Sequence, residues 1–330
     1  MASLDDLGHD EFELLARLAF GYYEEGLTQE ALARRFGLSR PKVQRLLDRA
    51  RSVGVVDIRI SAPPWLHVDR ERELREAFGL AEVIIAPARA DPQAQREEVA
   101  RAAARYLERS LGDGSIVAVS HGRDTGEVPR FFGPSRRIET TFVSAMGGSP
   151  LADSPTNPNE IARRLADRCG GGAMGLYAPA YVESERMRDE LLRQPAVSET
   201  LRAAERASVA LVGIGGTDDD CTMVRSGCFS VEEIRRLRAA GAVGDVLGNY
   251  VDVDGGRLDS AETGRLVGLG LAELRAIETV VVVVSEAEKP LAILGVLRTG
   301  VVDVLVVDEG NALFLLEQAR ETELRPGRKV

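Results

Sequence analysis

The stretch LTQEALARRFGLSRPKVQRLLDRA, residues 27–50, determines the fold of the first part of this 330-residue chain. Its apolar residues recur at intervals of three and four, which predicts short amphipathic helices. Thr28 can cap one helix, and Gly37 can end it because glycine readily adopts the left-handed conformation that follows a helix. Ser39 can cap the next helix, whose first turn tolerates Pro41 because amides there have no partner to lose. Two short helices joined by a tight glycine turn are typical of a helix-turn-helix.

The second of these helices has one apolar and one polar face. Val43, Leu46, Leu47 and Ala50 repeat at i, i+3, i+4 and i+7, which predicts a buried stripe. Arg and Lys on the polar face can neutralise DNA phosphates, and Gln can pair with adenine. The alternative to DNA binding is an ordinary helical bundle whose charged face is solvated. The residues predicted to contact DNA are the cap residues and the polar residues outside this stripe: Thr28, Gln29, Ser39, Arg40, Lys42, Gln44, Arg45 and Arg49.

The charge of this segment is opposite to that of the whole chain. The formal net charge of the protein is −10, which by itself argues against nucleic acid as a partner. Residues 27–60 contain eight Lys or Arg and three Asp or Glu, so this segment is +5 and the remainder is −15. The local positive charge therefore favours DNA as the partner of the N-terminal segment alone.

The residues on either side complete a small N-terminal domain. Apolar spacing predicts one further helix upstream, with an inner face formed by Phe12, Leu15, Leu18, Ala19 and Tyr22. Downstream, VGVVDIRI at 53–60 predicts a short strand, and SAPPW at 61–65 breaks the pattern with two prolines. We therefore predict a DNA-binding domain at 1–61 and a second domain at 62–330.

The composition indicates a globular protein of a reducing cytoplasm. Hydrophobic residues make up 44% of the chain, which is enough for a large core. The first fifteen residues do not resemble a signal peptide, and the aliphatic run 280–284 is far shorter than the roughly 20 residues that span a bilayer. Three cysteines without CxxC spacing predict free thiols, and three histidines argue against a metal cluster. We expect no cofactor and no membrane partner.

Residues 62–330 alternate β-branched runs with helical stretches. The runs are AEVIIAP, SIVAVS, TTFVSAM, ASVALVGIG, TVVVVVS and VVDVLVVD. Helical stretches such as NEIARRLADRC, VEEIRRLRAAG and KPLAILGVLRTG lie between them. Continuous apolar strands separated by helices predict an α/β fold with a parallel sheet covered on both faces.

Ligands of such sheets bind beyond the carboxyl ends of the strands. Glycine-rich or polar loops follow four of the predicted strands, at 121–128, 147–160, 216–220 and 286–290. Such glycines are also common in simple turns. Lys289 is the only lysine within the α/β body and is a candidate to bind a polar or anionic group, the alternative being a surface lysine. Asp252 is the leading carboxylate candidate, the alternative being an Asx-type turn.

With both parts placed, the chain resembles the SorC family of bacterial sugar-responsive transcription regulators over nearly its full length. The resemblance rests on the order and spacing of several segments, beginning with residues 27–60. The others are NPNEIARRLADRCG, YAPAYVES, ALVGIGG, GDVLGNYVDVDG and EKPLAILGVLRTGVVDVLVVDEGNALFLLE.

The resemblance implies a Rossmann-like effector domain related to sugar-phosphate isomerases and CoA transferases. It also implies operator DNA as a partner, a sugar, polyol or sugar-phosphate effector, and a homo-oligomer, commonly a tetramer. Carried over by position, the effector-binding residues are His121, Gly122, Arg123, Asp124, Thr125, Met146, Gly147, Gly148, Asn157, Asp252 and Lys289.

The chain departs from the family pattern at two of these positions. His121 replaces an aromatic or small residue, and Met146 occupies a position where sugar-phosphate binders can have an arginine. Asp124 would repel a phosphate, whereas Arg123 would attract one. A phosphorylated effector and a neutral sugar or polyol therefore both remain open.

Two other classes of function compete with a regulator. An isomerase-like enzyme with an N-terminal helical appendage needs a positioned base, for which Asp124, Asp252 and Glu286 are candidates. A nucleotide-binding protein is disfavoured because no complete phosphate-loop motif is present. The helix-turn-helix, which an isomerase does not need, favours a regulator that is not an enzyme.

Overall fold

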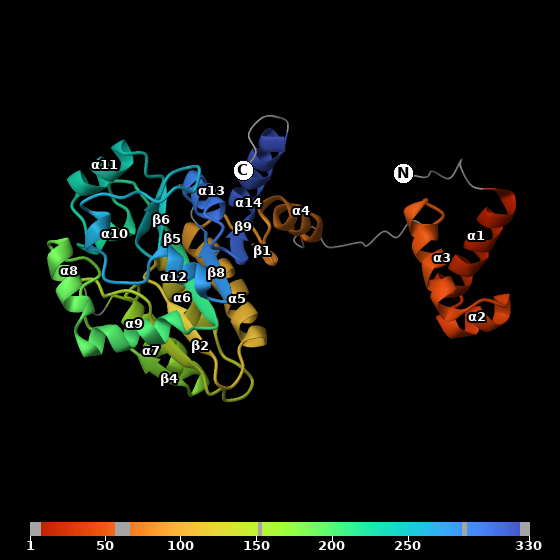
Figure 1. The fold of residues 1–330 in the computed structure, drawn as a ribbon, viewed down its shortest axis with the longest axis horizontal. Helices are drawn as coiled ribbons and strands as arrows, with labels where there is room; N and C mark the ends of the chain where they lie inside the picture. Colours follow the sequence, from red (N-terminus) through yellow and green to blue (C-terminus); the bar gives the residue numbers. More distant parts are fainter. Residues whose placement is uncertain (1–7, 57–66, 151–153, 286–288, 324–330) are drawn as a thin grey trace. The chain divides into compact units, whose positions relative to one another are not determined.

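The chain divides into two compact units, residues 1–62 and 63–330, called here the N-terminal and C-terminal units. The computed structural model describes residues 8–56, 67–150, 154–285 and 289–323 (Figure 1). The predicted linker at 61–65 and the second half of the predicted strand at 53–60 lie outside the described residues. The first half of that strand, residues 53–56, forms a turn.

The N-terminal unit has the predicted helices, which are α1 (His9–Tyr23), α2 (Gln29–Phe36) and α3 (Arg40–Ser52). The Thr28 hydroxyl accepts a hydrogen bond from the Ala31 amide at 3.2 Å and caps α2. Gly37 ends α2 with a φ of 64°, a left-handed conformation that favours glycine. Ser39 occupies the N-cap position of α3, but its side chain makes no capping hydrogen bond.

The core of the N-terminal unit is smaller than predicted. Leu18, Leu32 and Val43 are fully buried between the helices. Phe12 and Tyr22, which were predicted to face inward, are 42% and 36% exposed. They lie toward the ends of α1, where the shorter α2 and α3 do not cover them, so the buried stripe of α1 is limited to its middle.

The C-terminal unit is built on one twisted sheet. Seven parallel strands follow the order β1-β9-β8-β5-β2-β3-β4, and β6 and β7 extend from β5 as an antiparallel pair. All six strands predicted from β-branched runs are present. The strands are β1 (Glu82–Ala86), β2 (Ile116–Val119), β3 (Thr141–Ser144), β4 (Gly172–Met174), β5 (Val209–Gly216), β6 (Gly244–Val246), β7 (Asn249–Val251), β8 (Thr279–Val284) and β9 (Val304–Asp308).

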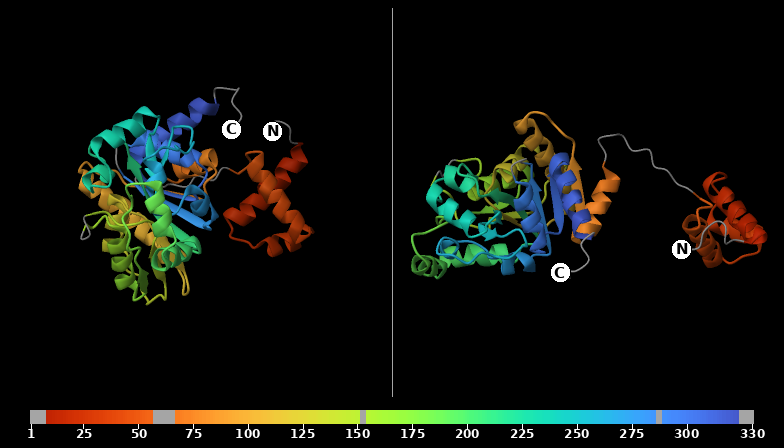
Figure 2. Two further views of the ribbon diagram at one scale, coloured as in Figure 1. Left: turned by 60° about the vertical axis from the view of Figure 1, so that its left-hand side comes forward. Right: turned by 90° about the horizontal axis from the view of Figure 1, so that it is seen from above.

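Helices cover both faces of this sheet (Figure 2). Val117 and Val119 of β2 pack with apolar residues of α5, α6 and α7, whereas Ala118 faces the opposite core, to which α9, α12 and α13 contribute. The helices are α4 (Val68–Phe78), α5 (Pro92–Ser110), α6 (Arg123–Phe131), α7 (Pro158–Cys169), α8 (Glu185–Leu192), α9 (Pro195–Glu205), α10 (Thr222–Arg225), α11 (Val231–Ala239), α12 (Leu271–Ala276), α13 (Pro290–Arg298) and α14 (Glu309–Glu323).

The topology creates a switch point in the middle of the sheet. From β2 the chain proceeds through β3 to β4 on one side, and from β5 through β8 to β9 on the other. The loops that follow β2 and β5 therefore diverge and leave a crevice at their carboxyl ends, where ligands of α/β proteins bind. No helix among the described residues is long and apolar enough to cross a membrane.

Candidate functional site

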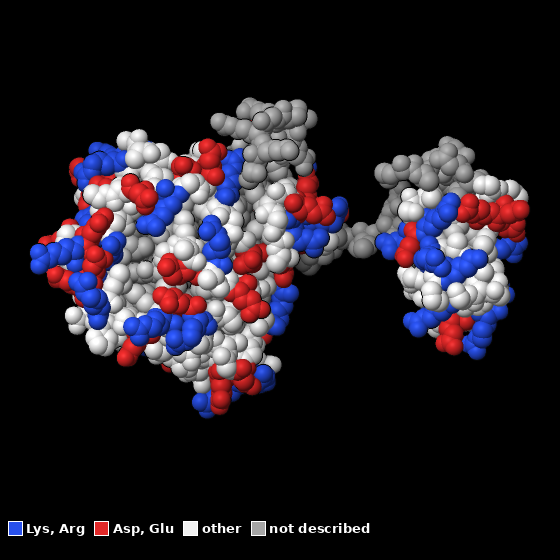
Figure 3. Space-filling view, in the orientation of Figure 1, with Lys and Arg blue, Asp and Glu red and all other residues white. Residues whose placement is uncertain are grey.

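The polar face of α3 presents most of the predicted DNA-contacting residues to solvent. Arg40, Lys42, Gln44 and Arg45 are exposed on this helix. Figure 3 shows Lys and Arg side chains among acidic ones on the visible face of the N-terminal unit. Within the described residues, Arg40 and Lys42 have no ion-pair partner, so both are available to phosphates or bases. Arg49 differs, because its guanidinium pairs with Glu11 of α1 at 3.0 Å.

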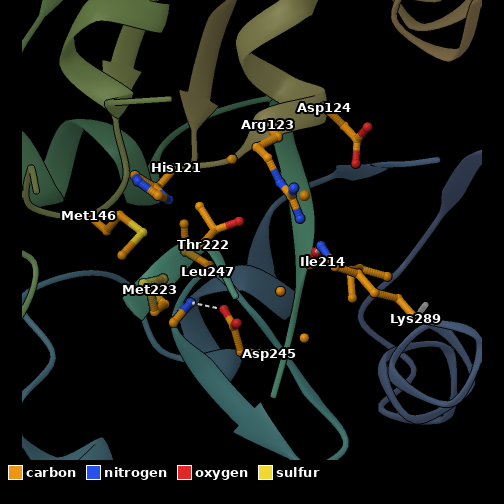
Figure 4. Close-up of a pocket in the computed structure, with 15 residues that line it drawn as sticks. His121, Arg123, Asp124, Met146, Ile214, Thr222, Met223, Asp245, Leu247 and Lys289 are labelled. Atoms are coloured by element: carbon orange, nitrogen blue, oxygen red, sulfur yellow. Dashed lines mark hydrogen bonds between the residues drawn. The ribbon is translucent and has the colours of Figure 1, made fainter. Parts of the chain in front are cut away.

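A pocket lies at the switch point of the sheet (Figure 4). The loop after β2, the end of β5, the start of β6 and the residue before α13 contribute to it. Six of the predicted effector-binding residues line this pocket, namely His121, Gly122, Arg123, Asp124, Met146 and Lys289. The structure therefore brings together residues more than 160 positions apart at the edge where the sheet is expected to bind a ligand.

Asp245 is a buried carboxylate that lines the pocket. It lies on β6 and is 3% exposed. Its Oδ2 accepts a hydrogen bond from the Gly248 amide at 2.8 Å, whereas its Oδ1 has no hydrogen-bond partner among the described residues. Burial raises the pKa of this carboxyl to about 6, although the Gly248 amide and the Lys289 charge both act to lower it. A buried carboxylate oxygen facing a pocket is suited to accept a hydrogen bond from a ligand hydroxyl.

The strand beside Asp245 must contain glycine at one position. Gly215 of β5 pairs with Asp245 of β6 in the antiparallel ladder. A Cβ atom at Gly215 would lie 1.9 Å from the Asp245 Oδ1. The close approach of β5 to β6 therefore requires glycine at position 215, because glycine has no side chain. This approach places the backbone of 213–216 along the pocket wall.

Two cationic side chains reach the same pocket. Lys289 is 6% exposed, and its Nζ donates a hydrogen bond to the Ile214 carbonyl oxygen at 3.0 Å. Figure 4 shows Arg123 extending from the start of α6 toward the middle of the lining residues. The α6 N-terminus also lies here, and free amides at a helix start favour electron-rich groups. The pocket thus offers donors from Lys289, Arg123 and the backbone opposite the Asp245 acceptor.

His121 is a neutral member of the lining. It is 8% exposed, and burial lowers its pKa to about 4. Its Nε2 lies 3.3 Å from the Thr156 hydroxyl oxygen. At neutral pH the ring therefore carries no charge and does not add to the attraction of an anion.

Asp124 is held by residues outside the pocket centre. The Ser285 hydroxyl donates a hydrogen bond to its Oδ1, and the Arg96 Nε lies 3.6 Å from the same oxygen. The predicted repulsion between Asp124 and a phosphate is therefore reduced, because the Arg96 charge opposes that of the carboxylate.

Four predicted residues lie beside the pocket instead of lining it. The Thr125 hydroxyl is fully buried behind the first turn of α6, and Asn157 caps α7 by accepting a hydrogen bond from the Asn159 amide at 3.1 Å. The amides of Gly147 and Gly148 donate to the carbonyl oxygens of Val267 and Ala178, at 2.8 Å each. These residues shape the surrounding loops.

Asp252 does not belong to the pocket. Its Oδ1 accepts hydrogen bonds from the amides of Asp254 and Gly256, at 2.9 and 2.8 Å, in the turn after β7. This is the Asx-type turn that the sequence left as the alternative. Asp245, seven positions earlier, lines the pocket in its place.

Sequence reasoning missed several lining residues besides Asp245. Gly213, Ile214, Gly215 and Gly216 come from the end of β5, and the others are Thr222, Met223, Leu247 and Gly248. The one available signal for Asp245 was a single carboxylate within the apolar segment AVGDVLGNY. That segment forms β6 and β7, which are three residues each and were not predicted as strands.

No group of three or more His, Cys, Asp or Glu side chains among the described residues could hold a metal ion. Cys169, Cys221 and Cys228 are free thiols, and burial raises the pKa of each. Raised thiol pKa values disfavour the reactive thiolate at neutral pH.

Comparison with known proteins gives matches over most of the chain. A family model described as "Putative sugar-binding domain" matches residues 63–317. The uncharacterized transcriptional regulator YjhU of Escherichia coli (strain K12) is 30% identical over 301 residues, which cover 89% of this chain and 92% of that protein. The erythritol catabolism regulatory protein EryD of Brucella abortus (strain 2308) is 29% identical, covering 96% of this chain and 99% of EryD.

A solved structure matches the chain over nearly its whole length. The full-length sorbitol operon regulator SorC of Klebsiella pneumoniae matches with a TM-score of 0.72 and 26% sequence identity. The match covers 93% of this chain and 99% of that structure. It therefore includes both the N-terminal helices and the α/β unit.

Proposed function

The chain belongs to the SorC family of sugar-responsive transcriptional regulators, and on this premise we propose that it binds operator DNA through α3 and a sugar or polyol effector in the pocket. The observation that carries the effector assignment is the buried Asp245 carboxylate, whose Oδ1 has no hydrogen-bond partner among the described residues. Lys289 and Arg123 supply donors in the same pocket. A polyhydroxylated ligand has both the donors and the acceptors that these groups need.

The polar face of α3 supports the DNA assignment. Arg40 and Lys42 are exposed at the start of the second helix of a helix-turn-helix, where such proteins contact DNA. One such helix makes few contacts with a duplex. We therefore propose that the chain works as a homo-oligomer whose helices read half-sites about one helical turn apart. Light scattering at micromolar concentration should give at least a dimer, and a monomer would contradict this proposal.

Groups of opposite charge in the pocket compete for the effector. Arg123, Lys289 and the start of α6 favour an anionic group, whereas the ionised Asp245 disfavours one placed beside it. The names of EryD and SorC refer to erythritol and sorbitol, both uncharged polyols. A ligand with hydroxyls toward Asp245, and either a hydroxyl or a phosphate toward Arg123, satisfies all three side chains.

The geometry supports a regulator in preference to an isomerase-like enzyme. Of the bases considered from the sequence, Asp124 is engaged by Ser285 and Arg96, and Asp252 caps its own turn. Glu286 lies outside the described residues. We infer that effector binding instead shifts the protein between DNA-binding and non-binding states, which requires different affinities for the two states.

A two-step experiment tests this function. Thermal-shift measurements with a panel of sugars, polyols and their phosphates should give one chemical series that raises the melting temperature, because a ligand of the native state stabilises it. That compound should then change the affinity of the full-length protein for a DNA site selected from a random library. A compound that stabilises the protein but is converted to a product would support the enzyme instead. Failure to enrich any DNA sequence would contradict the regulator.

A further inference from the structure

Two neighbouring side chains hold the amide group of Gln44 on α3. The Gln29 Nε2 donates a hydrogen bond to the Gln44 Oε1. The Gln44 Nε2 in turn donates to both carboxylate oxygens of Asp48, at 3.1 Å each. Gln44 and Asp48 are exposed and Gln29 is half-buried at the start of α2, so the three side chains form a small network on the surface of the helix-turn-helix.

This network permits only one orientation of the Gln44 amide. An ionised carboxylate accepts hydrogen bonds but cannot donate them, so Asp48 must face the NH2 group. The opposite orientation would place the Gln44 oxygen against the carboxylate, and this contact would be repulsive. Gln44 is therefore oriented before any DNA arrives.

The orientation leaves Gln44 with one donor and one acceptor position. A glutamine amide has two N–H protons and two oxygen lone pairs. Asp48 uses one proton and Gln29 one lone pair. In the major groove, adenine presents the N7 acceptor beside the N6 donor, which match the remaining N–H proton and oxygen lone pair of Gln44. Guanine instead presents two acceptors, N7 and O6. A glutamine free of Asp48 could turn both protons toward guanine, but the network prevents this.

Building on the proposed DNA-binding function, we propose that Gln44 reads one adenine in each half-site and that Asp48 and Gln29 are positioning residues that exclude guanine there. Gln44 lies in the first half of the 13-residue α3, the part of a recognition helix that contacts base edges. Asp48 lies one turn further along the helix, so it holds Gln44 from the side away from the helix start. Its negative charge also disfavours close phosphate contact at this point.

The test uses the full-length protein and a randomised double-stranded DNA library. Sequences selected by the parent protein should contain an adenine at one fixed position. Gln44→Ala should remove the preference for this adenine and leave the rest of the selected sequence profile unchanged. Measured on the selected site, the parent should prefer A·T over G·C at that position by roughly five- to hundredfold. Asp48→Asn should reduce this A-to-G ratio toward one, because asparagine can present either its oxygen or its NH2 to Gln44. Gln29→Ala should reduce the ratio by a smaller factor.

Controls separate positioning from general electrostatics. Asp10→Asn removes the same charge from an exposed site at the start of α1 that makes no hydrogen bond to Gln44. Both charge-removing variants should raise affinity for all sequences, but only Asp48→Asn should change the A-to-G ratio. Asp48→Glu, which keeps a carboxylate on the same face, should retain most of the preference. Unchanged melting temperatures would show that the variants are folded.

The outcomes distinguish this inference from the proposed function. Enrichment of a site with no Gln44-dependent adenine would overturn the base assignment, as would Gln44→Ala with an unaltered profile. An Asp48→Asn variant that keeps the full A-to-G ratio would overturn the positioning role. If the parent protein enriches no sequence at all, the proposed DNA-binding function fails first.

Discussion

Charged side chains are exposed on α3 but buried in the pocket of the C-terminal unit. Arg40 and Lys42 lie in solvent, where salt screens their charges and each contributes separately to binding. Asp245 and Lys289 are 3% and 6% exposed, and burial raises the pKa of Asp245 from 3.8 to about 6 despite the opposing effects of the Gly248 amide and the Lys289 charge. The α3 face is therefore suited to many additive contacts with a polyanion, and the pocket to a few strong contacts with one small ligand.

The difference also concerns how each site is assembled. The α3 face comes from about 25 consecutive residues, whose caps and periodicity are local. The pocket combines the ends of β2, β3 and β5 with β6 and the start of α13. Its side chains are held by contacts such as the Ser285–Asp124 hydrogen bond, across 161 positions of the chain. A change in the pocket should therefore alter its neighbours, whereas a change on α3 should remain local.

The largest expected effect comes from removing the base-contacting face of α3. In the triple variant Arg40→Ala, Gln44→Ala, Arg45→Ala, specific DNA affinity should fall by about a hundredfold or more, since each good base contact contributes about 1–3 kcal/mol. Fluorescence anisotropy on the selected site would measure this change. The matched control is Arg186→Ala, Arg193→Ala, Gln194→Ala, which removes the same residue types from exposed positions of the C-terminal unit. Equal loss in both variants would contradict a role specific to α3.

The next largest effect separates the pocket carboxylate Asp245 from Asp252, which the sequence favoured but which lies outside the pocket. Asp245→Asn should weaken effector binding by roughly tenfold or more, because a hydrogen bond to a charged group contributes about 1.5–3 kcal/mol. Asp252→Asn removes the same charge from a turn outside the pocket and should leave effector affinity unchanged. Calorimetry with the compound found by thermal shift would compare the two. Loss of affinity in the Asp252 variant alone would return the site to the carboxylate favoured by the sequence.

Features that depend on neighbouring residues could be predicted from the sequence, whereas features that depend on long-range strand pairing could not. Helix caps such as Thr28 and Gly37, and strands with uninterrupted β-branched runs, depend on neighbouring residues and were predicted. The pair β6–β7 has three residues per strand and includes glycine and asparagine, which are poor strand formers. Asp245 faces the pocket because β6 pairs with the end of β5, and this pairing across some 30 residues has no local signal.

Burial of aromatic residues in the N-terminal unit was overestimated for a related reason. The spacing of Phe12 and Tyr22 fits the inner face of α1, but periodicity does not tell how far a partner helix extends. The α2 helix has only eight residues. Periodicity therefore predicted the buried stripe in the middle of α1 and failed toward its ends.

The pH dependence of effector binding sharpens the contrast between buried and exposed charges. If hydroxyls bind the ionised Asp245, affinity for a neutral polyol should decrease about tenfold between pH 7 and pH 5, as the carboxyl with a pKa of about 6 takes up a proton. His121, with a pKa of about 4, stays neutral over this range. Calorimetry across this range should show the decrease in the parent and a flat profile in Asp245→Asn. A neutral polyol is the ligand for this test because a phosphate group has its own pKa near 6.

The same shift predicts the pH dependence of stability without effector. Because the Asp245 pKa is higher in the folded state than its ordinary 3.8, the folded protein holds a proton that the unfolded chain releases between about pH 4 and 6. The contribution of this group to the free energy of unfolding should therefore decrease as the pH rises through that window. The difference between the parent and Asp245→Asn in urea unfolding would isolate it. A difference that grows with rising pH would contradict the assigned shift.

The smallest expected effect compares two exposed cations of α3, of which Arg49 has an ion-pair partner and Lys42 has none among the described residues. Each phosphate contact contributes about −0.9 to the slope of log affinity against log salt concentration. Lys42 has no ion-pair partner among the described residues, so Lys42→Ala should reduce the magnitude of the slope by nearly this amount. Arg49 must first leave Glu11, to which it is bound at 3.0 Å, so Arg49→Ala should reduce the slope by less. In a Glu11→Gln background Arg49 loses that anchor, and its removal should then reduce the slope as much as removal of Lys42. Equal slope changes for Lys42→Ala and Arg49→Ala in the parent background would show that the Glu11 pair does not restrain Arg49, and that all cations of this face act independently.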